Sequence, residues 1–179
     1  MTLSPRSGSP FEAPDNRSAA IFLDETDVAR AAQTDACVLL TGSGTAAETL
    51  AYRIHSLSGW RYGPFIAVDC GLPEALVEHR LLEALGSGDD SLLEPQPRLS
   101  QDGTLYLQEV GRLSTRLQAW LADRLTGLRA RRGHVHVRRR VLASSSEFLL
   151  PRVYEGTFND HLFYRLNVIH VVLMEATSA

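Results

Sequence analysis

The chain has 179 residues and contains no lysine, so arginine supplies all 18 of its basic side chains. Its two cysteines, Cys37 and Cys70, are too few for a cysteine-based zinc site, and we expect both to be buried free thiols. No apolar run approaches the length of about 20 residues that a membrane span needs. The net charge of −3 argues against nucleic-acid binding over the whole surface, but it is compatible with a local basic patch.

The N-terminus lacks the apolar core of a signal peptide, and two free thiols suit a reducing compartment, so we expect a cytoplasmic protein. The first 17 residues contain Pro5, Pro10 and Pro14 with serine and glycine between them, which predicts a disordered leader over residues 1–17. The rest, residues 18–179, has the 44% apolar and 22% charged composition of an ordinary soluble domain. We therefore predict a single globular domain after the leader.

Short apolar runs alternate with segments of helical periodicity along this domain. The predicted strands are 37–40, 65–68, 104–107, 141–143 and 168–173, and the first two have the continuous apolar pattern of strands buried on both faces. Helices are expected within 21–33, after Gly44, after Pro73, after Ser114 and around 160–166, and residues 87–102 are expected to form a loop. This alternation predicts an α/β fold with a parallel sheet and helices on both faces.

The first strand leads into a turn that has the outline of a phosphate-binding loop. Glycines at 42 and 44 are followed by a helix whose apolar side chains recur at the spacing of one buried face. In a working loop, backbone N–H groups and a lysine bind the phosphates, whereas here Ala46 and Ala47 occupy the usual glycine and lysine positions. The residues of this nucleotide-binding remnant are Gly42, Ser43, Gly44, Thr45, Ala46, Ala47 and Glu48.

Polar residues also follow the other predicted strands. Asp69 ends the second strand, Gln108 and Glu109 end the third, and Ser144–Ser146 end the fourth. Ligands of parallel α/β sheets bind at the carboxyl ends of the strands. These residues and the glycine turn are therefore expected to lie at one edge of the sheet.

Five ordered segments together resemble one family, the AAA+ domain of sigma-54-dependent transcription activators, which are bacterial enhancer-binding proteins. The segments are TGSGTAAETLAYRIHSLS, GPFIAVDC, DGTLYLQEVGRL with the following LQAWL, VLASSSEFL, and FNDHLFYRLNV, and they span roughly residues 20–173. The resemblance implies a three-layer P-loop NTPase fold with a five-stranded parallel sheet. The family's C-terminal helical lid has no counterpart in the sequence, so we expect a truncated AAA+ domain over 18–179.

The sequence departs from the family at the positions that carry its chemistry. The family's Asp–Glu pair holds magnesium and activates water, but here it reads Gln108 and Glu109. Asp69 stands where the family has an asparagine that switches this glutamate, and Ser145 and Ser146 replace a nucleotide-sensing Thr–Asn pair. The resemblance therefore implies no bound metal and no working catalytic residue.

The family also supplies two arginines near the fifth strand to a neighbouring subunit's active site. In this chain Asn159 occupies the first of these positions and Arg165 the second. The sigma-contacting GAFTGA loop of the family is expected between Gly86 and Asp102, where the sequence GSGDDSLLEPQPRLSQD has no such motif.

Three further features each have two interpretations. Seven arginines between Arg124 and Arg140 either contact phosphates or form a solvated hairpin, and the second is favoured because few aromatics lie among them. His134 and His136 would share one side of a strand, but a third metal ligand is missing, so surface histidines are favoured. Trp60 and Tyr62 form either a contact patch or part of the core.

These observations lead to three hypotheses. The first is a sigma-54-activator-like domain that has lost its ATPase chemistry and acts by protein contact, with an intact activator or another transcription-regulatory protein as partner. No cofactor is expected for it, beyond at most weak binding of ATP or ADP. The second is a divergent ATPase in which an arginine replaces the missing lysine. The third is a nucleic-acid-binding module that uses the Arg124–Arg140 run.

Overall fold

The computed structural model describes residues 25–42, 44–85, 102–130 and 138–173. Four features predicted from the sequence lie outside these ranges. They are the disordered leader over residues 1–17, Ser43 of the glycine turn, nearly all of the 87–102 loop, and the histidines His134 and His136.

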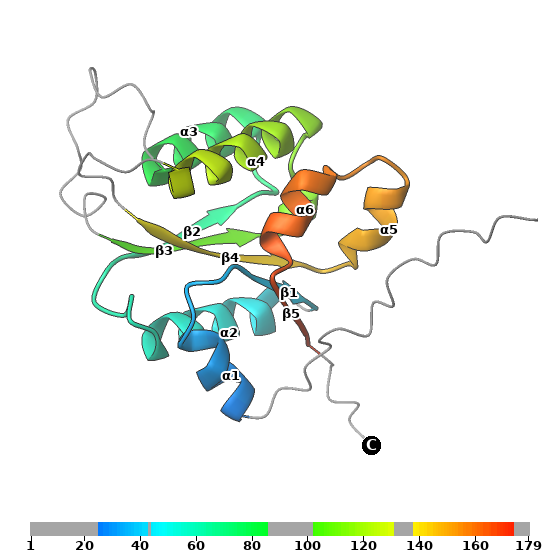
Figure 1. The fold of residues 1–179 in the computed structure, drawn as a ribbon. Coiled ribbons are helices and arrows are strands. Elements are labelled where there is room, and N and C mark those ends of the chain that lie inside the picture. The colour runs from blue at the N-terminus through cyan, green and yellow to red at the C-terminus, as the bar shows by residue number, and fades with distance from the viewer. Residues whose placement is uncertain (1–24, 43, 86–101, 131–137, 174–179) are drawn as a thin grey trace, which may run out of the picture.

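The described residues form one five-stranded parallel sheet with the strand order β2-β3-β4-β1-β5 (Figure 1). The strands are β1 (Val38–Thr41), β2 (Phe65–Asp69), β3 (Gly103–Gln108), β4 (Arg139–Ser145) and β5 (Ile169–Val172). Every ladder between neighbours is parallel. This confirms the fold class predicted from the sequence, and the strand ends differ from the predicted ones by one or two residues.

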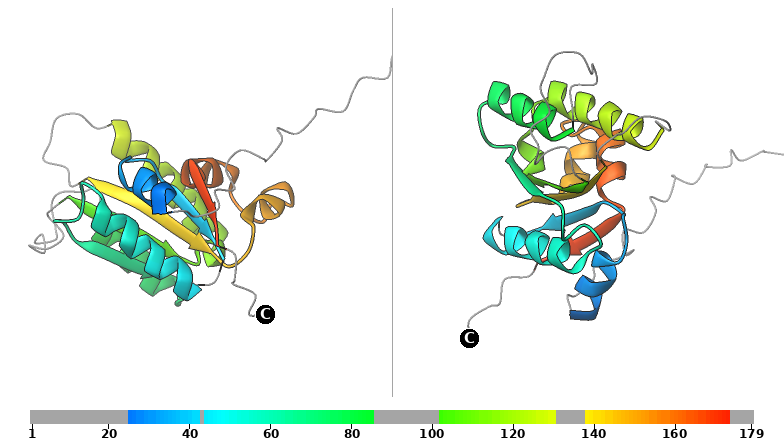
Figure 2. Two further views of the ribbon diagram at one scale, coloured as in Figure 1. Left: turned by 90° about the horizontal axis from the view of Figure 1, so that it is seen from below. Right: turned by 90° about the vertical axis from the view of Figure 1, so that its left-hand side faces the viewer.

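Helices cover both faces of the sheet and make three layers, as the turned views show (Figure 2). One face carries α1 (Glu25–Ala32) and α2 (Gly44–Leu57). The opposite face carries α3 (Glu74–Leu85), α4 (Thr115–Ala130) and α6 (Asp160–Leu166), and the short elements are η1 (Val110–Arg112) and α5 (Leu149–Tyr154). Within the described ranges, no helix is both long enough and apolar enough to cross a membrane.

The sheet separates two hydrophobic cores because side chains alternate between its faces along each strand. In β1, Leu39 packs with α3, α4 and α6, whereas Val38 and Leu40 pack with α1 and α2. In β3, Leu105 and Leu107 belong to the first core, and Tyr106 belongs to the second. The alternation is regular in β1, which leads into the glycine turn, and in β3, which leads into the Gln–Glu pair. Both features therefore follow strands that are packed on both faces.

Local signals explain where the helices begin. Ser114 caps α4 as predicted, because its Oγ accepts a hydrogen bond from the Leu117 backbone N–H at 3.3 Å. The carbonyl of Pro73 accepts the first backbone bonds of α3, from Leu76 and Val77. Asn159 caps α6, and its Oδ1 accepts from the Leu162 backbone N–H at 2.8 Å.

Two sequence-based expectations were wrong, and one helix was missed. β2 is not buried on both faces, because it lies at the sheet edge and leaves Ala67 and Asp69 exposed. Cys70 is buried, but Cys37 precedes β1 and is only half-buried. Helix α5 was not predicted, although Pro151 in its first turn is a recognised start signal, since the N–H that proline lacks has no partner there.

Candidate nucleotide-binding site

The polar residues predicted to share one edge of the sheet do so. Asp69 and Gln108 are register partners at the ends of β2 and β3, and Thr41 and Ser145 are partners at the ends of β1 and β4. Two backbone bonds join the β1–α2 turn to its neighbours: Gly42 N–H donates to the Ser145 carbonyl at 3.0 Å, and Leu173 N–H donates to the Thr41 carbonyl at 2.7 Å. The turn therefore lies between the ends of β4 and β5.

Gly42 is required by this arrangement. Its φ of 146° lies in a region that L side chains rarely adopt. A Cβ added there would lie 2.6 Å from the Leu173 Cβ and 2.8 Å from the Leu173 carbonyl oxygen. Gly44 is different, because the nearest atoms to an added Cβ are the Gln108 and Glu109 side chains at 3.9 Å. The turn is thus in close contact with the end of β5 at Gly42, whereas at Gly44 it has ordinary contacts with the end of β3.

Helix α2 begins at Gly44, and its first turn contains no basic side chain. Thr45, Ala46 and Glu48 are exposed, whereas Ala47 is completely buried in the core between α2 and the sheet. The usual lysine position is therefore a packing position in this chain. The start of α2 has backbone N–H groups of the kind that bind phosphates.

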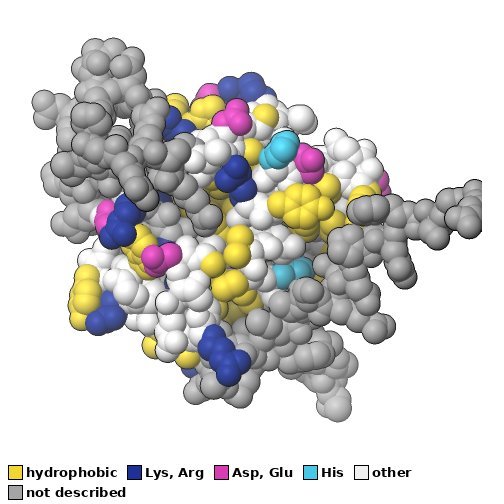
Figure 3. Space-filling model, viewed as in Figure 1, with side chains coloured by type: hydrophobic (Ala, Val, Ile, Leu, Met, Phe, Trp, Pro, Cys, Tyr) yellow, Lys and Arg dark blue, Asp and Glu magenta, His cyan; other side chains and the backbone are white. Residues whose placement is uncertain are grey.

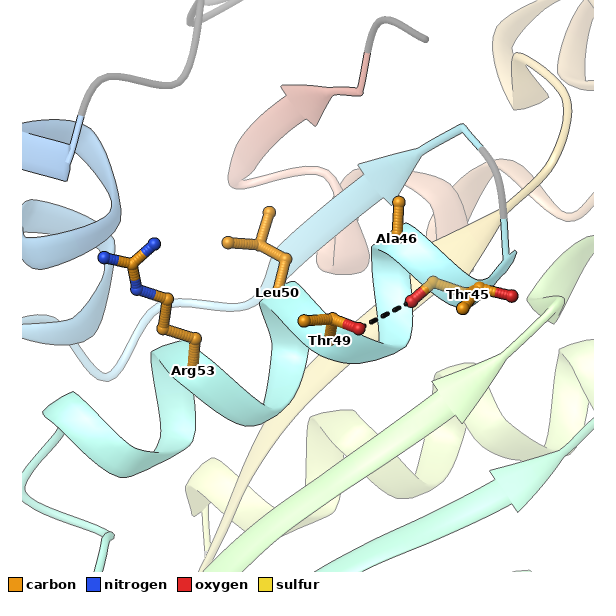
Figure 4. Close-up of a pocket in the computed structure, with 5 residues that line it drawn as sticks. All are labelled: Thr45, Ala46, Thr49, Leu50 and Arg53. Carbon is orange, nitrogen blue, oxygen red and sulfur yellow. Dashed lines mark hydrogen bonds between the residues drawn. The ribbon is translucent and has the colours of Figure 1, made fainter. Parts of the chain in front are cut away.

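An open hollow of about 510 Å³ lies along α2 and is lined by Thr45, Ala46, Thr49, Leu50 and Arg53. Figure 4 shows how these side chains project from the helix. The Thr49 hydroxyl donates to the Thr45 carbonyl at 2.9 Å, so it is occupied by its own helix. Arg53 is the one arginine that lines the hollow. It lies six residues beyond Ala47, about 9 Å further along the helix axis from the start of α2, so it does not occupy the lysine position.

Glu109, the position of the water-activating acid, is held by a neighbouring strand end. Its backbone is left-handed, with φ 53° and ψ 52°. Its Oε2 accepts from the Ser146 backbone N–H at 3.0 Å and from the Ser146 hydroxyl at 2.9 Å. The structure therefore brings two of the predicted site residues together, in a contact that occupies the carboxylate.

A buried tyrosine supports this contact, and the sequence analysis missed it. The Tyr106 hydroxyl donates to Ser144 Oγ at 2.8 Å, and the same oxygen accepts from the Glu109 backbone N–H at 3.4 Å. Burial raises the pKa of Tyr106 to about 12, so the hydroxyl remains a donor at neutral pH. The one signal in the sequence was the position of Tyr106, two residues before Gln108 on the same strand.

The switch position Asp69 and the sensor position Ser145 both stabilise turns by accepting a hydrogen bond from a backbone N–H group two residues later. Asp69 Oδ1 accepts from the Gly71 backbone N–H at 2.8 Å, and Ser145 Oγ accepts from the Glu147 backbone N–H at 3.3 Å. The adjacent Cys70 thiol has a pKa raised to about 12, first by burial and then by the charges of Asp69 and Glu109. At that pKa the thiol is not a nucleophile at neutral pH.

The two positions equivalent to the family's arginine pair lie on or next to α6, which packs on α4, α5 and β4. Asn159 serves as the cap of α6, and its own backbone N–H donates to Gln118 Oε1 at 2.7 Å. Arg165 is half-buried and makes no hydrogen bond or ion pair within the described residues. Gln118, which the sequence analysis did not single out, is 1% exposed and also donates to the Leu113 carbonyl at 2.8 Å.

Three arginines of the basic run are described at the start of β4 and take part in the fold. Arg138 pairs with Asp102 at 2.9 Å, and Arg139 Nε donates to the carbonyl of Ala84 near the end of α3 at 3.1 Å. Arg140 is 1% exposed and donates to the carbonyls of the last two residues of α1. The expectation of a solvated hairpin is therefore wrong for Arg140, because β4 carries its side chain into the core beneath α1.

Burial lowers the pKa of Arg139 and of Arg140, opposed in part by nearby carboxylates. The Arg138 guanidinium also lies 5.2 Å from the Trp60 ring centroid, and Trp60 Nε1 donates to Asp35 at 2.8 Å. The Trp60 side chain is thus fixed by contacts within the fold, whereas Tyr62 is 82% exposed. The part of the chain that the structure describes contains no group of three or more His, Cys, Asp or Glu side chains suited to a metal.

A parallel sheet in the order β2-β3-β4-β1-β5 with a glycine turn between β1 and α2 defines a P-loop NTPase domain. The family model of the Sigma-54 interaction domain matches residues 16–172, and the chain belongs to this family.

Two curated relatives illustrate the match. The chain is 40% identical over 156 residues to the regulatory protein AtoC of Escherichia coli K12, covering 82% of this chain and 34% of AtoC. It is 34% identical over 172 residues to the sigma-54-dependent transcriptional activator SfnR of Pseudomonas putida, covering 91% of this chain and 46% of SfnR. The chain thus spans about a third to a half of the length of these relatives.

Solved structures agree on the fold. NtrX from Brucella abortus in complex with ATP superposes with a TM-score of 0.67 at 27% identity, covering 83% of this chain and 35% of NtrX. The P-loop NTPase domain of a sigma-54 activator from E. coli superposes with a TM-score of 0.59 at 19% identity, over 83% of this chain and 98% of that domain. The second likeness concerns the fold alone.

Proposed function

We propose that this chain is a sigma-54-activator-like domain that does not hydrolyse ATP and acts in bacterial transcription control through protein contact. The observation that carries the proposal is the complete burial of Ala47 at the lysine position. A phosphate at the start of α2 would meet backbone N–H groups but no cationic side chain from that turn. Phosphoryl transfer depends on neutralising charge, so the loss of this cation removes a central part of the reaction.

The acidic pair supports the same proposal. Gln108 offers an amide where a magnesium ligand is needed, and an amide is a poorer ligand than a carboxylate for a hard cation. Glu109 keeps its carboxylate, but Ser146 already donates two hydrogen bonds to it. The Asn159 side chain caps α6 instead of supplying an arginine, and an arginine finger alone is worth about 10³ to 10⁵ in rate in GTPases.

The ATPase alternative is tested by phosphate release from ATP and magnesium. We expect the purified chain and its Glu109→Gln variant to give the same background rate. A rate well above that of a mock purification, abolished by Glu109→Gln, would show that the protein is an enzyme.

Nucleotide binding is measured separately, by titration with a fluorescent ATP analogue. The test variant restores three positions together: Ala46→Gly, Ala47→Lys and Gln108→Asp. Because Ala47 is buried, circular dichroism must first show that the variant keeps the fold of the natural chain. We then expect it to bind the analogue at least tenfold more tightly than the natural chain, because it regains a cation at the start of α2 and a metal ligand. Equal affinity of the two proteins would mean that these positions do not limit binding. The matched control carries Thr49→Lys, which adds the same charge to the outer side of α2.

The partner we propose is an intact sigma-54 activator or another transcription-regulatory protein. The relatives are named as regulators of transcription, and a domain without its own turnover can act on such a protein by occupying part of its surface. The experiment adds increasing amounts of the chain to a purified activator and measures the activator's ATPase rate. We expect a saturable change in that rate. A rate that stays constant over a large excess of the chain, for several activators from the source organism, would reject this partner class.

The nucleic-acid alternative has less support from the described residues. Arg138, Arg139 and Arg140 contact Asp102 and the ends of α3 and α1, so their charges are engaged within the fold. We expect only weak, sequence-independent binding to duplex DNA, with a logarithmic salt slope of about −0.9 for each phosphate contact.

A further inference from the structure

A second hollow, of about 410 Å³, lies at the start of α4 and α6 and beside the turn that follows α5. The polar residues that line it are Thr115, Gln118, Thr157, Asn159, Asp160 and Tyr164. Its lining contains one carboxylate, that of Asp160, and no Arg, Lys or His side chain. We call it the α4–α6 hollow. The one formal charge of its lining is therefore negative.

The side chains of this hollow present oxygen acceptors in fixed positions. Gln118 Oε1 accepts from the Asn159 backbone N–H at 2.7 Å, and Asn159 Oδ1 accepts from the Leu162 backbone N–H at 2.8 Å. Each of these carbonyl oxygens has a second lone pair. Gln118 cannot turn away, because it is 1% exposed and its Nε2 donates to the Leu113 carbonyl. The backbone N–H groups of Asn159 and Leu162 are thus engaged, and acceptor capacity remains on the Gln118 and Asn159 side chains.

Asp160 and Tyr164 add a charge and a flat apolar surface. One carboxylate oxygen of Asp160 accepts from the His161 backbone N–H at 2.7 Å, which fixes the group at the start of α6. The Tyr164 ring is 64% exposed and packs edge-on against Phe163, with the ring centroids 5.3 Å apart. Figure 3 shows exposed hydrophobic surface over α6, close to acidic and histidine side chains. A partly supported ring beside a carboxylate offers both cation–π and ionic contacts.

We infer that the α4–α6 hollow accepts an arginine side chain from a partner protein. A guanidinium is planar, presents five donors in a fixed fork and stacks on aromatic rings, which matches a set of oxygen acceptors beside Tyr164. A lysine ammonium is a more compact and more strongly hydrated charge, and it gains less from a flat ring. A phosphate or other anion would meet Asp160 without a compensating cation. This inference rests on the proposed function, in which the chain works by protein contact.

The test is an amide NMR titration of the whole chain at a constant pH of about 7.5. The probe is N-acetyl-arginine amide. The matched probe is the citrulline analogue, which has nearly the same shape but no charge. We expect chemical-shift changes at Thr157, Asn159 and Tyr164 that saturate in the millimolar range, equivalent to about −4 kcal/mol. We expect binding of the citrulline analogue to be at least tenfold weaker, as loss of a charged contact implies.

Two variants locate the probe. Asp160→Asn retains an oxygen for the His161 N–H but removes the charge, and Tyr164→Ala removes the ring. We expect each to weaken the arginine probe by about three- to tenfold. Asp123→Asn and Tyr62→Ala make the same changes at exposed positions away from the hollow and are expected to leave binding unchanged.

Equal affinity for arginine and citrulline, or shift changes that Asp160→Asn does not alter, would overturn the inference. Its failure is distinguishable from failure of the proposed function. If the chain still alters an activator's ATPase rate when both Asp160 and Tyr164 are substituted, contact occurs elsewhere and only the arginine site is wrong.

Discussion

Polar groups are arranged differently at the two ends of the strands, which we call the carboxyl edge and the amino edge of the sheet. At the carboxyl edge, where nucleotide would bind, hydrogen bonds of 2.9 to 3.4 Å link Glu109 to Ser144 and to Ser146, and this group reaches the surface. At the amino edge, a fully buried Arg140 caps the end of α1, and His55 Nδ1 lies 2.9 Å from Thr104 Oγ1 in the core. The polar groups of the carboxyl edge hydrogen-bond to each other near the surface, whereas the amino edge contains the charge of Arg140, which is costly to bury.

The two edges therefore differ in role: one contains the positions expected to act on a nucleotide, and the other contains residues that stabilise the fold. The positions where the resemblance predicts charged residues in a working ATPase are Ala47, Gln108 and Asn159. Ala47 packs in the core, Gln108 ends β3, and Asn159 caps α6. The arginine at the amino edge contacts no ligand position, yet its loss would leave buried carbonyls without donors. We therefore expect stability to depend most on the amino edge, and four measurements test that expectation.

The largest effect is expected for Arg140→Ala. The substitution leaves the Ala31 and Ala32 carbonyls without their donor and opens a cavity, so unfolding free energy should fall by about 3 kcal/mol. Part of the cost is offset, because Arg140 Nε has no hydrogen-bond partner within the described residues. Thermal unfolding should show a fall in Tm of roughly 6–12 °C.

Arg138→Ala is the matched control at the same strand. Its side chain is 72% exposed and its pairing with Asp102 is a surface contact, so its loss should cost less than about 1 kcal/mol. If both variants melted at the same temperature, burial of Arg140 would not be the source of its contribution.

The next largest effect is expected at the carboxyl edge, for Gly42→Ala. The added Cβ would lie 2.6 Å from the Leu173 Cβ at a φ that alanine rarely adopts, so we expect a loss of about 2 kcal/mol in urea unfolding. Gly44→Ala is the control, because its added Cβ has ordinary contacts and lies in the first turn of α2. It should be neutral or slightly stabilising. A reversed order would mean that the turn does not have the described geometry.

Acid should destabilise the protein through two histidines, the buried His55 and the half-buried His170. Burial lowers the pKa of His170, and burial with the nearby Arg140 charge lowers the pKa of His55. Between these lowered values and the unfolded value of about 6.5, the unfolded chain binds more protons, so unfolding free energy falls as pH drops below about 6.5. Tm measured across this range should decline less steeply in the His55→Gln and His170→Gln variants. His161→Gln, at an exposed position, should keep the original slope.

The smallest effect is expected for Ser146→Ala, which removes the hydroxyl bond to Glu109 but keeps the backbone bond. Both groups reach the surface, so the cost should be about 0.5–1 kcal/mol in chemical unfolding. Ser56→Ala serves as control, because the Ser56 hydroxyl bonds only its own helix. A loss from Ser146→Ala as large as that from Arg140→Ala would contradict the contrast between the two edges.

The sequence predicted the layers of this fold and the edge where polar residues meet. Periodicity and strand–helix alternation were sufficient because they follow from which side chains must be buried. The Glu109–Ser146 contact was not predictable, since it depends on how two strand ends are placed in register. Arg140 was misjudged for the same reason: a run of arginines suggests a solvated surface, and only the position of α1 above β4 supplies carbonyls to bind it.

The central place of β1 in the sheet has a consequence for biosynthesis. β1 pairs on one side with β4 and on the other with β5, so Val38 faces Leu142 and Ile169, each more than a hundred residues later in the chain. On a ribosome that adds about 5–20 residues per second, this apolar strand waits for several seconds before either neighbour exists. Only β2 and β3 can pair early. Nascent chains that stop short of β4 should therefore expose β1, and chaperone binding should fall once β5 has emerged.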